Sequence, residues 1–338
     1  MNARRPLLSL LAIGVLTVTA ACGEAGSSGT EAPVTSAPAA TGDSTAQACE
    51  PVAGESLVVL EDDQDLQTVD NIIPAVNAAA VASDPNLVPL LDSVSATLDT
   101  PTLIELNSAV DVERQTSTQV AEQYLADNGL AAQDPVGEGR PVVVGAGNFS
   151  ESETLAELYA GVLRAAGYDA STQAIGNRET YEPALVAGEL TVVPEYVGTL
   201  TEFLNKEVNG ADATPVASSD LDATVTELTA LGEQVGLVFG TPSQAQDQNA
   251  FAVTTAFADE YGVATLSELA ETCGGVVLGG PPECPERTFC QAGLEETYGL
   301  EVSEFVSLDA GGPLTKTALQ QGEIAVGLVF SSDAVLAG

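Results

Sequence analysis

Short apolar runs alternate with amphipathic segments along most of the 338-residue chain. Residues 85–98 carry apolar side chains at positions 87, 90, 91, 94 and 98, the spacing of one helix face. Similar patterns predict helices at residues 101–108, 117–128, 150–166, 221–236, 265–271 and 312–322. Strands are expected at residues 57–60, 142–144, 190–194 and 324–330 and near 237 and 251, with a strand–helix unit at 171–187. This alternation predicts an α/β fold with mainly parallel sheets.

Residues 1–22 have the parts of an export signal. Two arginines precede an apolar run at residues 7–18, which is too short to span a bilayer. Small residues then lead into Cys22, a pattern that resembles the lipobox of bacterial lipoproteins; ordinary secretory cleavage is the alternative. Residues 23–48 are mostly small and polar and predict a flexible tether. We therefore expect a lipid-anchored protein on the extracytoplasmic face of the cell membrane.

The composition excludes several classes of function. The chain has 49 acidic and 9 basic residues, a formal net charge of −40, so we expect no nucleic acid partner. It has no histidine, which removes histidine-based nucleophiles and histidine-ligated metals. The glycine loop at residues 145–149 lacks the lysine of a P-loop and the three glycines of a dinucleotide fingerprint. We expect neither a cofactor nor a metal.

Four cysteines follow Cys22, at positions 49, 273, 284 and 290. In an exported chain four cysteines suggest two disulfides, for which three connectivities exist. Metal binding is the alternative, but only Cys284 and Cys290 are close in sequence, which makes a poor zinc signature.

Eight short segments carry a family resemblance. They are residues 143–152 (VVGAGNFSES), 176–179 (GNRE), 194–199 (PEYVGT), 247–251 (DQNAF), 279–287 (GGPPECPER), 293–299 (GLEETYG), 308–316 (LDAGGPLTK) and 330–333 (FSSD). In composition and order they resemble the substrate-binding proteins of ABC importers for glycine betaine, choline and carnitine. The resemblance implies a ligand-binding protein without catalytic activity.

The order of the whole chain departs from this family. In the family, a segment like residues 57–63 and a helical tail like residues 74–130 follow the segment that resembles residues 330–333. Here both stand at the front of the chain. We therefore predict a circular permutation in which residues 131–141 join the old termini. An unrelated N-terminal domain is the alternative.

The family fold is a two-lobed α/β clamp of the type II periplasmic-binding-protein kind, with the ligand between the lobes. Mapped through the permutation, lobe 1 comprises residues 71–247, and lobe 2 comprises residues 49–70 plus 248–338. All four cysteines beyond Cys22 then fall in lobe 2. This placement implies the pairs Cys49–Cys273 and Cys284–Cys290.

Quaternary ammonium groups are held by aromatic faces and negative charge, since they cannot donate ordinary hydrogen bonds. The family uses a box of tyrosines. The resemblance places Tyr196 at one box position and Phe251 and Phe330 at two others, although either phenylalanine could be a core residue.

The polar candidates come from the same motifs. Arg287 matches the arginine that clamps a ligand carboxylate, with a surface ion pair as the alternative, and Thr199 matches a residue that holds the ligand. Asn148 and Phe149 fall in a loop at the mouth of the cleft. Asp70 stands where many relatives have the last tyrosine of the box, unless it is a turn acid outside the site.

These residues imply a monomeric receptor that delivers a small quaternary ammonium ligand to ABC permease subunits in the membrane. Gly147 replaces a carboxylate-binding lysine of some relatives, and Asp70 adds a negative charge, so the balance favours choline. Arg287 argues instead for glycine betaine. Three alternatives remain: a receptor for another small amine or amino-acid derivative, a cell-wall glycan hydrolase with a carboxylate pair, and a lipoprotein for adhesion or sensing.

Overall fold

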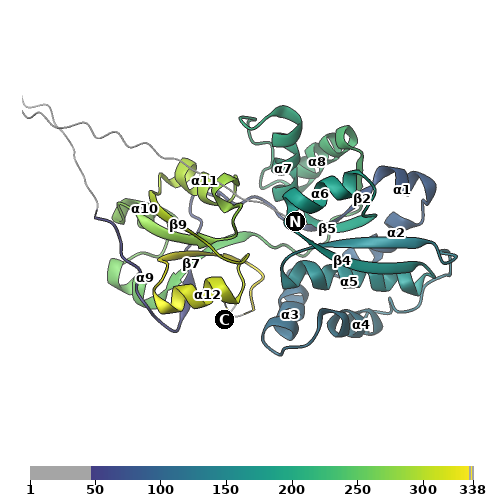
Figure 1. Cartoon of the computed structure of the whole chain (residues 1–338), viewed down its shortest axis with the longest axis horizontal. Helices are drawn as coiled ribbons and strands as arrows, with labels where there is room; N and C mark the ends of the chain where they lie inside the picture. Colours follow the sequence, from purple (N-terminus) through teal and green to yellow (C-terminus); the bar gives the residue numbers. More distant parts are fainter. Residues whose placement is uncertain (1–46, 335, 337–338) are drawn as a thin grey trace, which may run out of the picture. The chain divides into compact units, whose positions relative to one another are not determined.

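The computed structural model describes residues 47–334 and residue 336, which form two five-stranded sheets with helices around each (Figure 1). The strands of one, here the β3 sheet, lie in the order β4 (Asp169–Gly176), β3 (Pro141–Gly147), β5 (Val192–Tyr196), β2 (Ile72–Asn77) and β6 (Leu237–Phe239). Those of the other, the β10 sheet, lie in the order β1 (Leu57–Val59), β7 (Asn249–Thr254), β10 (Val326–Phe330), β8 (Val276–Gly280) and β9 (Val302–Ser307). The predicted α/β class is confirmed.

The helices divide between the sheets. Around the β3 sheet are α1 (Ala78–Ser83), α2 (Leu87–Ser95), α3 (Thr100–Asp111), α4 (Ser117–Asp127), α5 (Ser150–Ala165), α6 (Arg178–Val186), α7 (Val197–Asn209) and α8 (Leu221–Val235). Around the β10 sheet are α9 (Thr255–Tyr261), α10 (Leu266–Thr272), α11 (Gln291–Gly293), α12 (Pro313–Gln321), the 3-10 turn Cys284–Glu286 and the π turn Leu294–Tyr298. The strands of each sheet lie on one side of the proposed lobe division, whose boundaries stay a prediction.

The sheets are half antiparallel, so the prediction of mainly parallel sheets is wrong. β2 runs antiparallel to β5 and β6, and β7 runs antiparallel to β1 and β10. The other pairs, β3 with β4 and β5 and β8 with β9 and β10, are parallel. The reason is that β2 and β7 follow segments that arrive from the other sheet, residues 60–71 and 240–248. They are not joined to their neighbours through a strand–helix–strand crossover, which would make them parallel.

Strand β2 lies where the sequence analysis expected the start of a helical tail. All six of its residues are buried, so the strand shows no alternation of apolar and polar positions. Pro74 also lies inside it, and a proline argues against a central strand. Its carbonyl accepts a hydrogen bond from the Gly240 amide, which ties β2 to the second segment between the sheets.

The structure contains both of the disulfides that the resemblance implied. Cys49 pairs with Cys273, and Cys284 pairs with Cys290. The first joins the start of the described chain to the end of α10, and the second closes a loop of the β10 sheet. The alternative of a metal site gains no support: the described part of the chain has no cluster of metal-ligating side chains.

The connector before β3 is a packed segment. The Arg140 guanidinium pairs with the Asp84 carboxylate at 2.6 Å and lies over the Tyr168 ring. The Tyr168 hydroxyl donates to the same carboxylate at 2.7 Å. A side chain at Gly137 would meet the Tyr168 backbone nitrogen at 2.4 Å, so close packing requires glycine there. The end of the connector, residues 137–140, is therefore held against the segment that leads into β4.

Residues 1–46 lie outside the described part, and with them the expected signal sequence, the lipidation expected at Cys22 and nearly all of the expected tether. Within the described residues, no helix is both long and apolar enough to cross a membrane.

Candidate functional site

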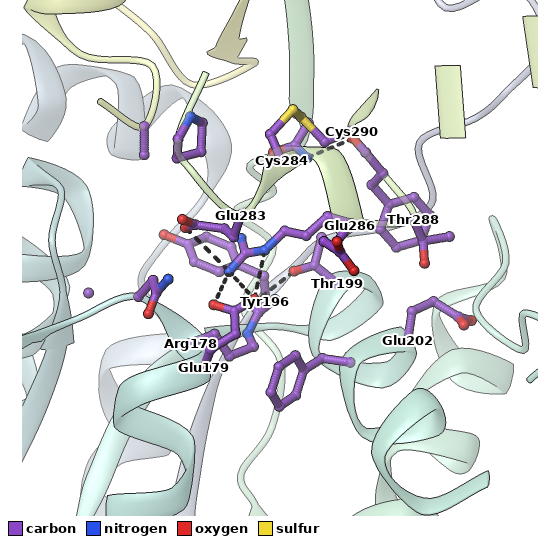
Figure 2. A pocket seen from close by; sticks show the side chains of 18 of the residues that line it. Arg178, Glu179, Tyr196, Thr199, Glu202, Glu283, Cys284, Glu286, Thr288 and Cys290 are labelled. Carbon is purple, nitrogen blue, oxygen red and sulfur yellow. Dashed lines mark hydrogen bonds and ion pairs between the residues drawn. A yellow bond between two sulfur atoms is a disulfide. The ribbon is translucent and has the colours of Figure 1, made fainter. Parts of the chain in front are cut away.

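A pocket of about 510 Å³ lies where loops of both sheets meet. Figure 2 shows side chains of α6 and α7 on one part of its wall and the loop of the Cys284–Cys290 disulfide on another. The lining includes seven of the eight ligand-site candidates: Asp70, Asn148, Phe149, Tyr196, Thr199, Arg287 and Phe330. Residues far apart in sequence thus meet around one cavity.

The eighth candidate, Phe251, is a core residue and does not line the pocket. Its side chain is 1% exposed and packs in the apolar cluster under the β10 sheet. Asn249 lies two residues earlier in β7, on the same face of the strand, and it does line the pocket. The strand therefore brings its first residue to the cavity and carries Phe251 past it into the core.

Three aromatic side chains form one wall, here the aromatic wall: Phe149, Tyr196 and Phe330. The ring centroids of Phe149 and Phe330 are 5.5 Å apart, and those of Phe149 and Tyr196 are 6.3 Å apart. Phe149 directly precedes α5, Tyr196 ends β5 and Phe330 ends β10. Strand ends and a helix start thus gather the rings, whose faces are suited to a cation.

Behind the aromatic wall lies a buried acidic network that the sequence analysis missed. The Glu151 carboxylate accepts hydrogen bonds of 2.6 Å from the Tyr196 hydroxyl, the Asn107 amide and the Ser332 hydroxyl. The Ser332 backbone amide donates to Asp247 at 2.9 Å. Burial raises the pKa of Asp247, and the nearby charge of Glu151 raises it further. Burial likewise raises the pKa of Glu151.

Asp70 belongs to the pocket and caps a helix. Its carboxylate accepts hydrogen bonds from the backbone amides of Gly198 at 2.8 Å and Thr199 at 3.0 Å, in the first turn of α7. A side chain at Gly198 would meet the Thr68 hydroxyl and the Val69 carbonyl, both at 2.4 Å, so glycine allows this approach. Burial raises the pKa of Asp70 to about 7, although the Thr199 amide favours the ionised form. Neither earlier interpretation, a box wall or a distant turn acid, included this cap.

Arg178 is bound by a protein carboxylate. Its guanidinium donates to both oxygens of Glu195, at 2.9 and 2.6 Å. It also donates to the Thr199 hydroxyl at 3.0 Å (Figure 2). The Tyr181 hydroxyl donates to Glu195 at 2.9 Å. Arg178 and Glu195 are 7% and 1% exposed. A buried bidentate pair of this kind is a fixed part of the wall.

Arg287 also has protein partners. Its guanidinium donates to the Glu179 carboxylate at 2.9, 3.1 and 3.2 Å and lies 3.5 Å from that of Glu283. It sits within the loop that the Cys284–Cys290 disulfide closes. The expected surface ion pair and the expected place in the pocket are therefore both present.

The wall of the pocket is acidic as a whole. Seven acidic and three basic side chains line it. The acids are Asp70, Glu179, Glu202, Glu207, Asp247, Glu283 and Glu286, and the bases are Arg178, Lys206 and Arg287. A surplus of negative charge beside aromatic faces is suited to a small cation.

Comparisons with known proteins point to one family. The family model described as the substrate binding domain of ABC-type glycine betaine transport systems matches residues 50–127 and 140–338. A curated glycine-betaine-binding protein of Pseudomonas aeruginosa is 32% identical over 83 residues, which are 25% of this chain and 27% of that protein. The chain thus matches about a quarter of the length of this relative.

Two solved structures are similar to this chain with low TM-scores. Apo YehZ of Escherichia coli gives a TM-score of 0.36 at 23% identity, over 56% of this chain and 69% of that one. A structure described as a glycine betaine/carnitine/choline ABC transporter gives a TM-score of 0.37 at 18% identity, over 59% of this chain and 70% of that one.

Proposed function

Because the chain belongs to the family of substrate-binding domains of ABC-type glycine betaine transport systems, we propose that its pocket binds a quaternary ammonium compound. Members of this family bind solutes outside the cytoplasm for a membrane permease, and they are not enzymes. The glycan hydrolase alternative is therefore set aside. The bound compound then passes to permease subunits in the membrane.

The aromatic wall beside the buried acids is the observation that carries this proposal. Each desolvated cation–π contact contributes about 0.5–2 kcal/mol, so the rings of Phe149, Tyr196 and Phe330 together supply several kcal/mol. Asp247 and Asp70 line the same cavity, and a bound cation favours the ionised forms of both. A neutral amino-acid derivative would gain neither contribution.

Calorimetric titration with choline, glycine betaine, carnitine, proline betaine and ergothioneine tests the proposal. At least one compound should bind without turnover. Tyr196→Ala should raise its dissociation constant about tenfold, since one cation–π face is lost. Tyr261→Ala is the matched control, because Tyr261 lies on α9 outside the pocket lining. Absence of binding by the whole panel, or equal effects of the two variants, would contradict the proposal.

For the segment outside the described residues we propose a lipid anchor at Cys22, supported by the lipobox-like sequence alone. Cys22→Ala should release the protein from membranes into the soluble fraction. Mass spectrometry of the mature N-terminus should find a lipidated cysteine. An unmodified N-terminus at another residue would refute the anchor.

We also propose that the chain is a circular permutation of its family's order. The two matched blocks, residues 50–127 and 140–338, support it, since the gap between them overlaps the expected junction at residues 131–141. A variant opened between residues 131 and 139, with its present ends joined by a flexible linker, should fold and bind the same ligand. Failure of this variant to fold with several linker lengths would contradict the permutation.

A further inference from the structure

Both arginines of the pocket are already held by protein carboxylates. The Arg178 guanidinium is bidentate on Glu195, and the Arg287 guanidinium is bidentate on Glu179. The third base, Lys206, has its ammonium 3.5 Å from the Glu286 carbonyl. A ligand carboxylate would therefore meet guanidinium groups whose Nε and Nη2 atoms already donate to protein carboxylates.

We infer that Glu179 determines specificity: by holding Arg287 it selects a cation without a carboxylate, such as choline, over a zwitterion such as glycine betaine. This deepens the proposed function and rests on it. Glu179 occupies the place on Arg287 that a ligand carboxylate would take. The chain thus supplies its own counter-ion for the arginine.

The geometry explains why a ligand carboxylate competes poorly. To take the Nε–Nη2 edge of Arg287 it must displace Glu179, and at any other edge it lies beside Glu179 as a second negative charge on a wall with seven acids. Arg287 cannot readily follow the ligand, because the Cys284–Cys290 disulfide closes its loop. A cation without a carboxylate leaves the ion pair intact.

The protonation of Glu179 is consistent with this role. Burial alone would raise the pKa of Glu179, but the hydrogen bonds and charge of Arg287 outweigh burial and lower it. The pair is therefore ionised at neutral pH. The two side chains are 31% and 41% exposed, so the pair itself contributes little, and it is the negative charge of Glu179 that disfavours a ligand carboxylate.

Glu179→Gln tests the inference, because glutamine keeps the shape of the side chain and removes its charge. Choline, glycine betaine and glycine betaine methyl ester are titrated by calorimetry; the ester keeps the trimethylammonium group without the negative charge. In the unaltered protein choline should bind roughly tenfold tighter than glycine betaine. In the variant the affinity for glycine betaine should rise about tenfold, while choline and the ester change less than about threefold.

Two further variants separate the possible causes. Glu296→Gln removes the same charge from an exposed residue outside the pocket lining, and it should leave all three affinities within about twofold. Arg287→Met added to Glu179→Gln tests the pair from the other side. If Glu179→Gln frees Arg287 for a ligand carboxylate, the double variant should lose the gain in glycine betaine affinity, while the affinity for choline changes less than about threefold.

The outcomes are distinguishable. A ratio of glycine betaine to choline affinity that stays within about twofold in Glu179→Gln overturns the role of Glu179, while binding of either compound leaves the proposed function standing. A gain in glycine betaine affinity that survives when Arg287→Met is added to Glu179→Gln likewise overturns it. Absence of binding by all three compounds in the unaltered protein refutes the proposed function itself.

Discussion

Binding of a cation should release protons, because Asp70 lines the pocket with a raised pKa. Burial moves the pKa of Asp70 from 3.8 to about 7, so about half of the molecules carry its proton at pH 7. A positive charge in the pocket stabilises the carboxylate and lowers this pKa. We expect choline to release up to about half a proton per molecule bound at pH 7.

The size of the effect follows from the same values. The difference between 3.8 and about 7 corresponds to roughly 4 kcal/mol for ionising Asp70 in the folded protein. The folded state holds the proton more tightly than the unfolded state. The stability from this group is therefore fully present below about pH 4 and is lost as the pH rises to about 7. A bound cation restores part of it.

Calorimetry in phosphate and in Tris at pH 7 measures the released protons, because the two buffers differ in ionisation enthalpy. Asp70→Asn should remove the part of the release that comes from Asp70, and Asp259→Asn, a change of an exposed α9 residue, should preserve the full release. Equal binding enthalpies in the two buffers, proton uptake, or full release from Asp70→Asn would refute the reasoning.

Three other changes have defined outcomes. Tyr196→Phe keeps the ring but removes the hydroxyl that donates to Glu151 at 2.6 Å. Chemical denaturation should show a loss of about 1–3 kcal/mol in unfolding free energy, while choline affinity stays within about threefold. A large loss of choline affinity would contradict a contact made by the ring. Replacing Cys49 and Cys273 by Ser opens a bridge across 224 residues and should lower the unfolding free energy by roughly 3–5 kcal/mol, whereas an unchanged denaturation midpoint would contradict this. Gly198→Ala places a methyl group against atoms only 2.4 Å away. It should lower the unfolding free energy by about 1–3 kcal/mol in thermal melting and weaken choline binding in calorimetry. Unchanged stability and unchanged affinity would contradict this.

Local patterns predicted the elements whose side chains alternate between core and solvent. The apolar spacing at residues 85–98 predicted α2 (Leu87–Ser95), and the helix expected at 150–166 is α5 (Ser150–Ala165). β2 was missed because both of its faces are buried and it contains a proline. The antiparallel pairing of β2 depends on the preceding segment, which arrives from the other sheet, and no local sequence pattern indicates this.

The site shows the same limit. The motifs correctly predicted that Tyr196 and Phe330 line the pocket, where each residue ends a strand. They could not reveal that Glu151 bonds Ser332 across 181 residues or that Arg287 bonds Glu179 across 108. The only local signal of Glu151 was its place in the first turn of α5, where an acid suits the helix dipole without any further role.

The central claim is that the pocket recognises a positive charge, and a comparison of choline with 3,3-dimethyl-1-butanol tests it most directly. The two molecules have the same shape, but a neutral carbon replaces the quaternary nitrogen. Competitive calorimetry should show choline binding at least about tenfold tighter, because the aromatic wall and the acids favour only the cation. Equal affinities, or tighter binding of the neutral alcohol, would contradict the account.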